Sequence, residues 1–292
     1  MKETSSLTAY VNNGFVPLEK AMVHIEDRGF QFADGVYEVV ACFGGAYLDL
    51  QPHLQRLQRS CDAVNIPLPK PMSELEDLVQ QAYAKNPFKD AMVYIQVTRG
   101  VAARSHVVQT TMTPTLVITV RNLPKPSDDK LKTGVKGITL QDIRWKHCEI
   151  KSIALLASVM GKQEAAKRGA DEAFWLDEQG HVLEGCATNI FAVIDGVLVT
   201  HPLDHQVLGG ITRDMAIQAA QNAGIEVQER AWKLDELGLT ECLMSSTTNA
   251  VMPITAMNDA AVGRGIPGEM GLKLRALMLL KLDDLRAGVK SS

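Results

Sequence analysis

The sequence predicts a two-domain chain that mixes α and β structure. Its 292 residues exceed the usual size of one domain, and 46% of them are hydrophobic, enough for a buried core without disulfides. Helix and strand patterns alternate in the first third, whereas short strands and tight turns dominate the second half. A polar stretch with two prolines separates these parts. We predict an α/β domain over residues 1–120, a linker over 121–130 and a β-rich domain over 131–292.

Two helices and two strands are expected in the first domain. Apolar residues recur at helical spacing over 54–64, and Pro52 before them suits a first helical turn. Ser73 and Glu76 form a capping box, which predicts a second helix running to Tyr83. Runs rich in Val, Ile and Thr predict strands at 92–98 and 115–120.

The second domain is predicted to consist of hairpins with helices between them. The pair Asp195–Gly196 is a strong two-residue turn signal between apolar runs. Glycines mark the ends of two apolar helical patterns. We expect helices at 152–168 and 212–223, and strands at 173–176, 181–183, 189–194, 197–201 and 225–230.

Composition excludes several classes of protein. A formal net charge of −4 argues against a nucleic-acid partner, which usually meets a basic face. The polar N-terminus and the lack of an apolar run of ~20 residues predict a cytoplasmic protein without a membrane partner. The five cysteines form no C-x-x-C pair, and His201 and His205 straddle Pro202, so neither a disulfide framework nor a metal site is expected.

Five features carry candidate chemistry. Lys151 is flanked by apolar residues at the head of the helix predicted at 152–168, where desolvation would lower its pKa and favour a Schiff base. Glu184 ends a predicted strand and could hold a proton on a heterocyclic nitrogen. The glycine pair in 208–213 leads into a helix, a typical anion site. The hydroxyl run at 245–249 could also hold a phosphate, and two arginines and a histidine in 98–106 could bind a carboxylate.

Each feature taken singly has a plainer interpretation. A lysine at a helix start commonly keeps its ammonium in water, and a glutamate at a strand end is commonly solvated. The glycine pair can be an ordinary junction capped by Thr212, and the hydroxyl run a polar turn. The loop at 98–106 can be a surface loop with solvated charges.

Together, the motifs resemble those of a known family. The stretch 25–38, Lys151, Glu184-Gly-x-x-x-Asn189, Gly209-Gly-Ile-Thr-Arg213 and Ser246-Thr-Thr248 occur in the same order in fold-type IV pyridoxal-phosphate enzymes. The resemblance extends from about residue 8 to about residue 260. The resemblance implies the fold of fold-type IV enzymes, with pyridoxal 5'-phosphate as the cofactor and a Schiff base on Lys151.

The resemblance also implies the other site residues. Glu184 would pair with the pyridine nitrogen, and Leu208 would pack against the ring. The cofactor phosphate would be held by residues from several segments, namely Arg56, Ile211, Thr212, Thr247 and Thr248.

Among the subfamilies, the chain is most similar to the D-amino acid aminotransferases. Their carboxylate trap consists of a tyrosine and an R-x-H loop from the partner subunit, which fall here on Tyr37, Arg104 and His106. The resemblance therefore implies a homodimer that transfers the amino group between D-amino acids, such as D-alanine, and 2-oxo acids. Two positions depart from the family: Ala33 replaces a common glycine, and Ala187 stands where D-specific members tend to carry a serine.

Other functions remain open at this point. A branched-chain L-amino acid aminotransferase or an aminodeoxychorismate lyase would share most of these motifs. An (R)-selective amine transaminase is less compatible with Arg104 and His106, because a buried guanidinium needs an anionic partner. A non-catalytic protein that binds pyridoxal phosphate or an acidic metabolite would not need Lys151.

Overall fold

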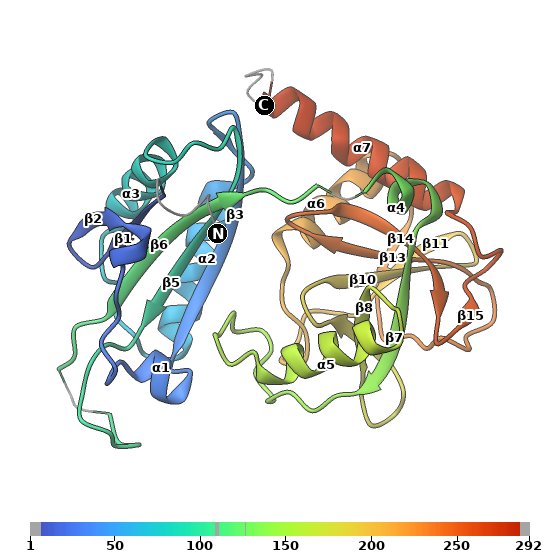
Figure 1. Ribbon diagram of the computed structural model, residues 1–292. Helices are drawn as coiled ribbons and strands as arrows, with labels where there is room; N and C mark the ends of the chain where they lie inside the picture. The colour runs from blue at the N-terminus through green and yellow to red at the C-terminus, as the bar shows by residue number, and fades with distance from the viewer. Residues whose placement is uncertain (1–6, 109–110, 126, 287–292) are drawn as a thin grey trace. The chain divides into compact units, whose positions relative to one another are not determined.

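The structure is a computed structural model that describes residues 7–108, 111–125 and 127–286, and it divides into two compact units (Figure 1). Unit 1 holds the described residues up to Leu123 together with Ile150–Ala154 and the described residues from Asp284 on. Unit 2 holds the described residues of Pro124–Glu149 and Leu155–Asp283. The segment with Lys151, which is predicted to belong to the second domain, belongs to unit 1. Backbone hydrogen bonds to β3 (Gly35–Phe43) hold it there.

The described residues of unit 1 form a six-stranded antiparallel sheet in the order β2-β1-β6-β5-β3-β4. Its remaining strands are β1 (Thr8–Val11), β2 (Gly14–Pro17), β4 (Ala46–Tyr47), β5 (Asp90–Thr98) and β6 (Thr115–Asn122), and its helices are the 3-10 helix η1 (Leu18–Lys20), α1 (Arg28–Phe32), α2 (Leu50–Ala63) and α3 (Met72–Ala84).

The core of unit 1 lies between this sheet and the helices α2 and α3. Leu54, Leu57 and Cys61 are fully buried and pack on the apolar face of β3 and β5. The helical spacing seen in the sequence is therefore the buried face of α2, and its burial contributes roughly 2 kcal/mol for each large apolar side chain. The predicted capping box is wrong, because α3 begins at Met72 and no side chain caps it.

The described residues of unit 2 form a nine-stranded mixed sheet, in which eight strands follow the order β12-β11-β10-β13-β14-β7-β8-β9 and β15 pairs with β14. Its strands are β7 (Val135–Gln141), β8 (Glu172–Leu176), β9 (Val182–Gly185), β10 (Asn189–Ile194), β11 (Val197–Thr200), β12 (Val227–Glu229), β13 (Leu239–Ser246), β14 (Ala250–Met257) and β15 (Ala260–Ala261). Its helices are α4 (Asp128–Thr133), α5 (Leu156–Lys167), α6 (Ile211–Asn222) and α7 (Glu269–Arg286), whose last residues lie beyond this unit.

Local sequence signals explain several of these elements. The hairpin of β10 and β11 turns at Asp195 and Gly196, which both have positive φ, as the D-G signal predicts. The predicted linker is shorter than expected, because β6 continues to Asn122 and α4 begins at Asp128. The side chain of Ser127 accepts a hydrogen bond from the amide of Lys130 and so caps α4.

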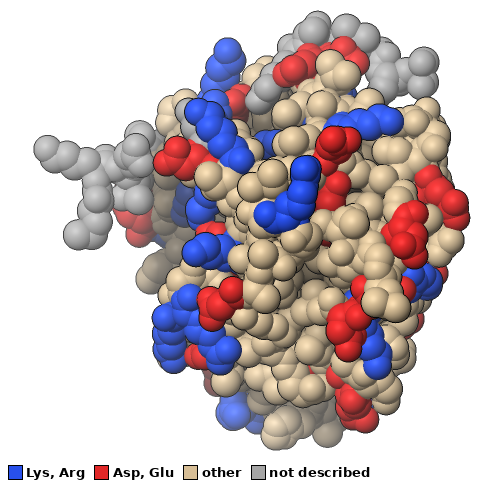
Figure 2. Space-filling view, turned by 90° about the vertical axis from the view of Figure 1, so that its right-hand side faces the viewer, with Lys and Arg blue, Asp and Glu red and all other residues tan. Residues whose placement is uncertain are grey.

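The surface carries both signs of charge. On the face shown in Figure 2, most of the surface is neither acidic nor basic, and lysines and arginines occur beside aspartates and glutamates. Within the part of the chain that the structure describes, no helix is long and apolar enough to cross a membrane.

Candidate active site

Lys151 lies in an extended segment of unit 1. The amide of Tyr37 donates to the carbonyl of Lys151 at 3.0 Å, and the amide of Ile153 donates to Gly35 at 3.0 Å. The predicted helix at 152–168 is therefore wrong at its start, because these bonds keep the chain extended and α5 begins only at Leu156. Nζ of Lys151 lies 4.4 Å from the centroid of the Tyr37 ring, so its ammonium rests on an aromatic face.

Tyr37 is predicted to bind substrate, and it lies on β3 in a stacked pair. Its ring centroid is 5.6 Å from that of Tyr94 on β5, with 28° between the ring planes. Burial raises the pKa of Tyr94 to about 12, and its hydroxyl donates to Gln96 at 2.6 Å. The ring beside Lys151 is thus supported by a neutral hydrogen-bonded neighbour.

Arg56 belongs to a buried polar network on β3 and α2. Its Nε and one terminal nitrogen donate to the carboxylate of Glu38 at 2.7 and 2.9 Å, and Nδ1 of His53 lies 2.8 Å from the same carboxylate. Burial alone would raise the pKa of Glu38, but the charge of Arg56 and the hydrogen bonds lower it to about 2. Arg56 is predicted to hold a phosphate, and Glu38 fixes the orientation of its guanidinium.

Arg104 and His106 lie in an exposed loop of unit 1. The guanidinium of Arg104 lies 4.6 Å from the ring centroid of Phe32, and the His106 ring lies 5.3 Å from it. Arg28 donates to the carbonyl of Ser105 and so ties this loop to α1. The structure therefore brings two of the three predicted trap residues together around one aromatic ring.

Glu184 is held in place by unit 2. Its carboxylate accepts a bond from Arg144, one from the amide of Leu208 at 3.0 Å and one from Asn189 at 3.2 Å. Only 8% of its side chain is exposed, which fits a carboxylate that meets a protonated nitrogen rather than bulk water.

Sequence reasoning missed Arg144. Its guanidinium bridges Glu184 and Asp142, with bonds of 2.9 and 3.0 Å to the latter, and also donates to the carbonyl of Gln206. Burial would lower the pKa of Arg144, but its bonds to Asp142 and the charge of Glu184 raise it above its usual value. No local motif marks this arginine, because its partners Glu184 and Gln206 lie 40 and 62 residues away.

The loop bonded to Glu184 leads directly into α6. Gly210 is the N-cap, and no side chain caps the helix, so the first-turn amides of Ile211 and Thr212 receive no side-chain acceptor. A Cβ at Gly210 would lie 2.0 Å from Oδ1 of Asn189, so a larger residue there would displace the side chain of Asn189. Uncapped amides at the positive end of a helix form an anion site.

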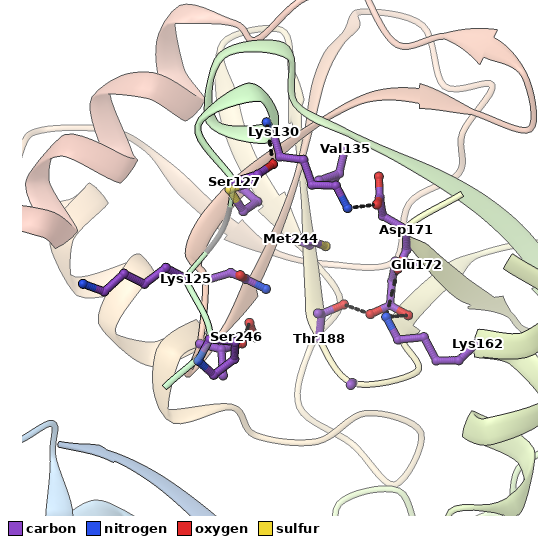
Figure 3. A pocket seen from close by; sticks show the side chains of 15 residues that line it. Lys125, Ser127, Lys130, Val135, Lys162, Asp171, Glu172, Thr188, Met244 and Ser246 are labelled. Atoms are coloured by element: carbon purple, nitrogen blue, oxygen red, sulfur yellow. Dashed lines mark hydrogen bonds and ion pairs between the residues drawn. The ribbon is translucent and has the colours of Figure 1, made fainter. Parts of the chain in front are cut away.

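The predicted hydroxyl run lies at the end of β13 and in the turn before β14. Thr248 and its neighbour Ser246 place their hydroxyl oxygens 3.3 Å apart, and Thr247 lies between them. Both Ser246 and Thr248 line a cavity of about 430 Å³ in unit 2 (Figure 3). The hydroxyl of Ser245 is buried without a hydrogen-bond partner among the described residues. Unit 2 therefore offers polar groups that suit a bound anion.

These groups fit a ligand with a protonated ring nitrogen at one end and a phosphate at the other. The amide of Leu208 donates to Glu184, and Ile211 follows three residues later, so carboxylate and helix amides are no more than about 14 Å apart. Among the described residues, no group of three or more His, Cys, Asp or Glu side chains is arranged to hold a metal ion.

Comparison with known proteins gives consistent matches. Residues 35–257 match the family model of class IV amino-transferases. The chain is 38% identical over 268 residues to the D-alanine aminotransferase of Listeria monocytogenes, covering 90% of this chain and 92% of the relative. It is 36% identical over 260 residues to that of Bacillus licheniformis, covering 89% and 91%. Among solved structures, the branched-chain aminotransferase of Thermoproteus uzoniensis with norvaline matches with a TM-score of 0.85 and 26% identity, covering 98% of this chain and 96% of that structure.

Proposed function

Because the chain belongs to the class IV aminotransferase family, we propose that it is a pyridoxal-phosphate-dependent D-amino acid aminotransferase acting on D-alanine and 2-oxo acids such as pyruvate and 2-oxoglutarate. The similarity to D-alanine aminotransferases over about nine tenths of both chains carries this proposal. The Arg104-Ser-His106 loop and the fixed carboxylate of Glu184 support it.

The cofactor is held by residues that the two units position separately. Lys151 would bind it covalently, and Glu184 would accept a hydrogen bond from its ring nitrogen. Leu208 would pack against the ring, and the phosphate would be bound by Arg56, Ile211, Thr212, Thr247 and Thr248. When bound, pyridoxal phosphate supplies an electron sink for the pair of electrons released at Cα of the substrate.

The residues of the chain would supply the charged groups around the cofactor and the base that moves the proton. Arg144 pairs with Glu184 and fixes its carboxylate, which would hold a proton on the ring nitrogen of the cofactor. With the cofactor bound, the amine of Lys151 would take the proton from Cα of the substrate as general base and pass it on as general acid. Tyr37 lies under this amine at 4.4 Å and limits the directions in which it can move.

We also propose that the active form is a homodimer in the cytoplasm. Arg104, His106 and Tyr37 bind the substrate carboxylate, with Arg104 and His106 acting across the subunit interface. Both are exposed in the single chain, and the same unit exposes large apolar side chains, which is typical of a surface that meets a partner. These side chains are Met22, Val23, Ile25, Phe30, Val101, Val107 and Val108. The five cysteines are free, as in reducing compartments.

A branched-chain L-amino acid aminotransferase is the second candidate. The solved structure that matches at a TM-score of 0.85 has a branched-chain aminotransferase activity in its name. The two candidates differ in the enantiomer that they accept, so a single experiment separates them.

The test is the visible absorption of the protein loaded with pyridoxal phosphate, before and after addition of D-alanine or L-leucine. Loss of the band with D-alanine alone supports the proposal, and loss with L-leucine alone moves the function to the second candidate. The variant Lys151→Ala is the control, because it lacks the amine and is expected to lose turnover. A protein that takes up no cofactor would refute both candidates.

A further inference from the structure

Glu172 is a buried carboxylate that the proposed mechanism does not use. It lies on β8 with 1% of its surface exposed, and it forms part of the wall of the cavity in unit 2 (Figure 3). Its carboxylate lies 3.1 Å from Nζ of Lys162 and accepts bonds from the amide of Ala173 at 3.1 Å and the hydroxyl of Thr188 at 3.3 Å. Burial raises the pKa of Glu172, and the charge of Lys162 opposes this effect. Burying a carboxylate is unfavourable unless it has hydrogen-bond or charge partners, and Glu172 has three.

The bond to Thr188 connects Glu172 to the turn that follows Glu184. The carbonyl of Thr188 accepts a bond of 2.8 Å from the amide of Gly185, the residue next to Glu184, and so closes the turn. The amide of Cys186 in this turn donates to the carbonyl of Ala173 at 3.0 Å. One side chain and one backbone carbonyl of β8 therefore hold the same turn.

Packing around this turn leaves no spare room. A Cβ at Gly185 would lie 2.2 Å from the hydroxyl of Thr188 and 3.0 Å from Cγ of Glu172. Beyond the turn, Asn189 begins β10 and donates to Glu184 at 3.2 Å. The segment from Gly185 to Asn189 is thus fixed at both ends, and Glu172 supports it through Thr188.

We propose that Glu172, acting through Thr188, is a positioning residue that holds Glu184 against the ring nitrogen of the cofactor; this rests on the proposed function of Glu184. We assign Glu172 no contact with cofactor or substrate. Its effect is to restrict the turn 185–188, so that the carboxylate of Glu184 keeps one orientation. The hydroxyl of Thr188 makes the contact through which Glu172 acts. It lies next to Ala187, the position at which D-specific members tend to carry a serine, and we infer that it replaces the hydroxyl missing there.

The experiment compares Glu172→Gln, Thr188→Val and the double variant with the unchanged chain. Glu178→Gln is the control, because Glu178 is exposed in the turn between β8 and β9. Pyridoxal phosphate is titrated into each protein to give its dissociation constant and the absorption maximum of the bound form. The kcat and KM for D-alanine and the melting temperature of the cofactor-free protein are measured alongside.

Both single variants are expected to bind pyridoxal phosphate about tenfold more weakly, as outer partners of a ligand group do at metal sites. Their absorption maxima shift, and kcat falls while KM for D-alanine is unchanged. The double variant is expected to bind pyridoxal phosphate as tightly as the single variant with the lower affinity, because both changes break the same connection between Glu172 and Thr188. Thr188→Val is nearly isosteric and keeps the test valid if Glu172→Gln does not fold.

Two results would overturn the proposal. The first is wild-type affinity and spectrum in both variants. The second is a loss of pyridoxal phosphate affinity that is additive in the double variant and parallels the fall in melting temperature of the cofactor-free proteins. That is the pattern expected of a purely structural role. If the unchanged chain takes up no pyridoxal phosphate, the proposed function itself fails, and this inference fails with it.

Discussion

Replacing Arg144 with methionine tests the electrostatics around Glu184. The substitution removes the cation shared by Glu184 and Asp142, whose side chains are only 8% and 17% exposed. Breaking a buried pair by removing one partner costs about 3–5 kcal/mol, because the other charge stays buried. We expect the free energy of unfolding of unit 2 to fall by about 4 kcal/mol. With a urea m-value of about 2 kcal/mol per molar, the midpoint falls by roughly 2 M.

The assay is urea unfolding followed by tryptophan fluorescence. The three tryptophans of the sequence, Trp145, Trp175 and Trp232, all lie in unit 2, so the signal reports on that unit alone. The control is Arg168→Met, which breaks a surface pair with Glu164 whose side chains are 51% and 34% exposed. Such a pair contributes about 0.5 kcal/mol or less.

Two further variants separate two causes of the lost stability: a buried charge left without its partner, and the loss of packing by the Arg144 side chain. Glu184→Gln combined with Arg144→Met is expected to recover part of the stability, because it removes one of the stranded charges. Arg144→Lys keeps the positive charge but loses the planar guanidinium, so its urea midpoint is expected to lie between those of Arg144→Met and the unchanged chain. If Arg144→Met moves the midpoint no further than Arg168→Met, the reasoning about this buried pair is wrong.

Three other predictions concern the carboxylate trap, acid stability and the start of α6. Arg104→Ala is expected to raise KM for D-alanine about tenfold or more without lowering the melting temperature, and an unchanged KM in steady-state kinetics would contradict the trap. The pKa of Glu38 is lowered from 4.5 to about 2, so its contribution of about 3 kcal/mol is present above pH 4.5 and is lost as the pH falls toward 2; acid unfolding of Glu38→Gln should lack this dependence. Gly210→Ala should cost about 1–3 kcal/mol in thermal unfolding, because the new Cβ meets Asn189 at 2.0 Å, whereas Gly209→Ala, with its nearest neighbour at 3.7 Å, should cost much less. Equal effects of the two alanines would count against this packing argument.

Local chemistry allowed much of unit 2 to be predicted from the sequence. The hairpin around Asp195–Gly196 and the helix before Gly224 depend on turn and cap residues within a few positions, and both occur within one or two residues of the predicted bounds. Glu184 was expected at a strand end, and it lies in the last two residues of β9. Such features need no long-range information.

Apart from the capping box at Ser73 and Glu76, the errors occur where distant residues decide the structure. The apolar pattern of residues 152–155 predicts helix, but Ser152 forms a bridge with Val36 and the amide of Ile153 donates to Gly35, so the helix begins only at Leu156. Arg144 and Glu172 carry no motif, and their importance comes from the partners Glu184 and Thr188, which lie 40 and 16 residues away in the sequence. The pattern of one segment cannot predict contacts of this kind, since tertiary pairing overrides local propensity.

The short segment Ile150–Ala154 has a consequence for how the chain folds. It pairs with the stretch of β3 that β4 leaves uncovered, since β4 pairs only with Cys42 and Phe43. Unit 1 is therefore not one continuous piece of chain, and its sheet edge is completed only by residues made well after Leu123. The pairing of Gly35 with Ile153 closes a loop of over a hundred residues, a slow step compared with hairpin formation. During synthesis, Lys151 is thus placed against β3 only after most of unit 1 has already been made, so the amine that we propose to bind the cofactor reaches its position late in folding.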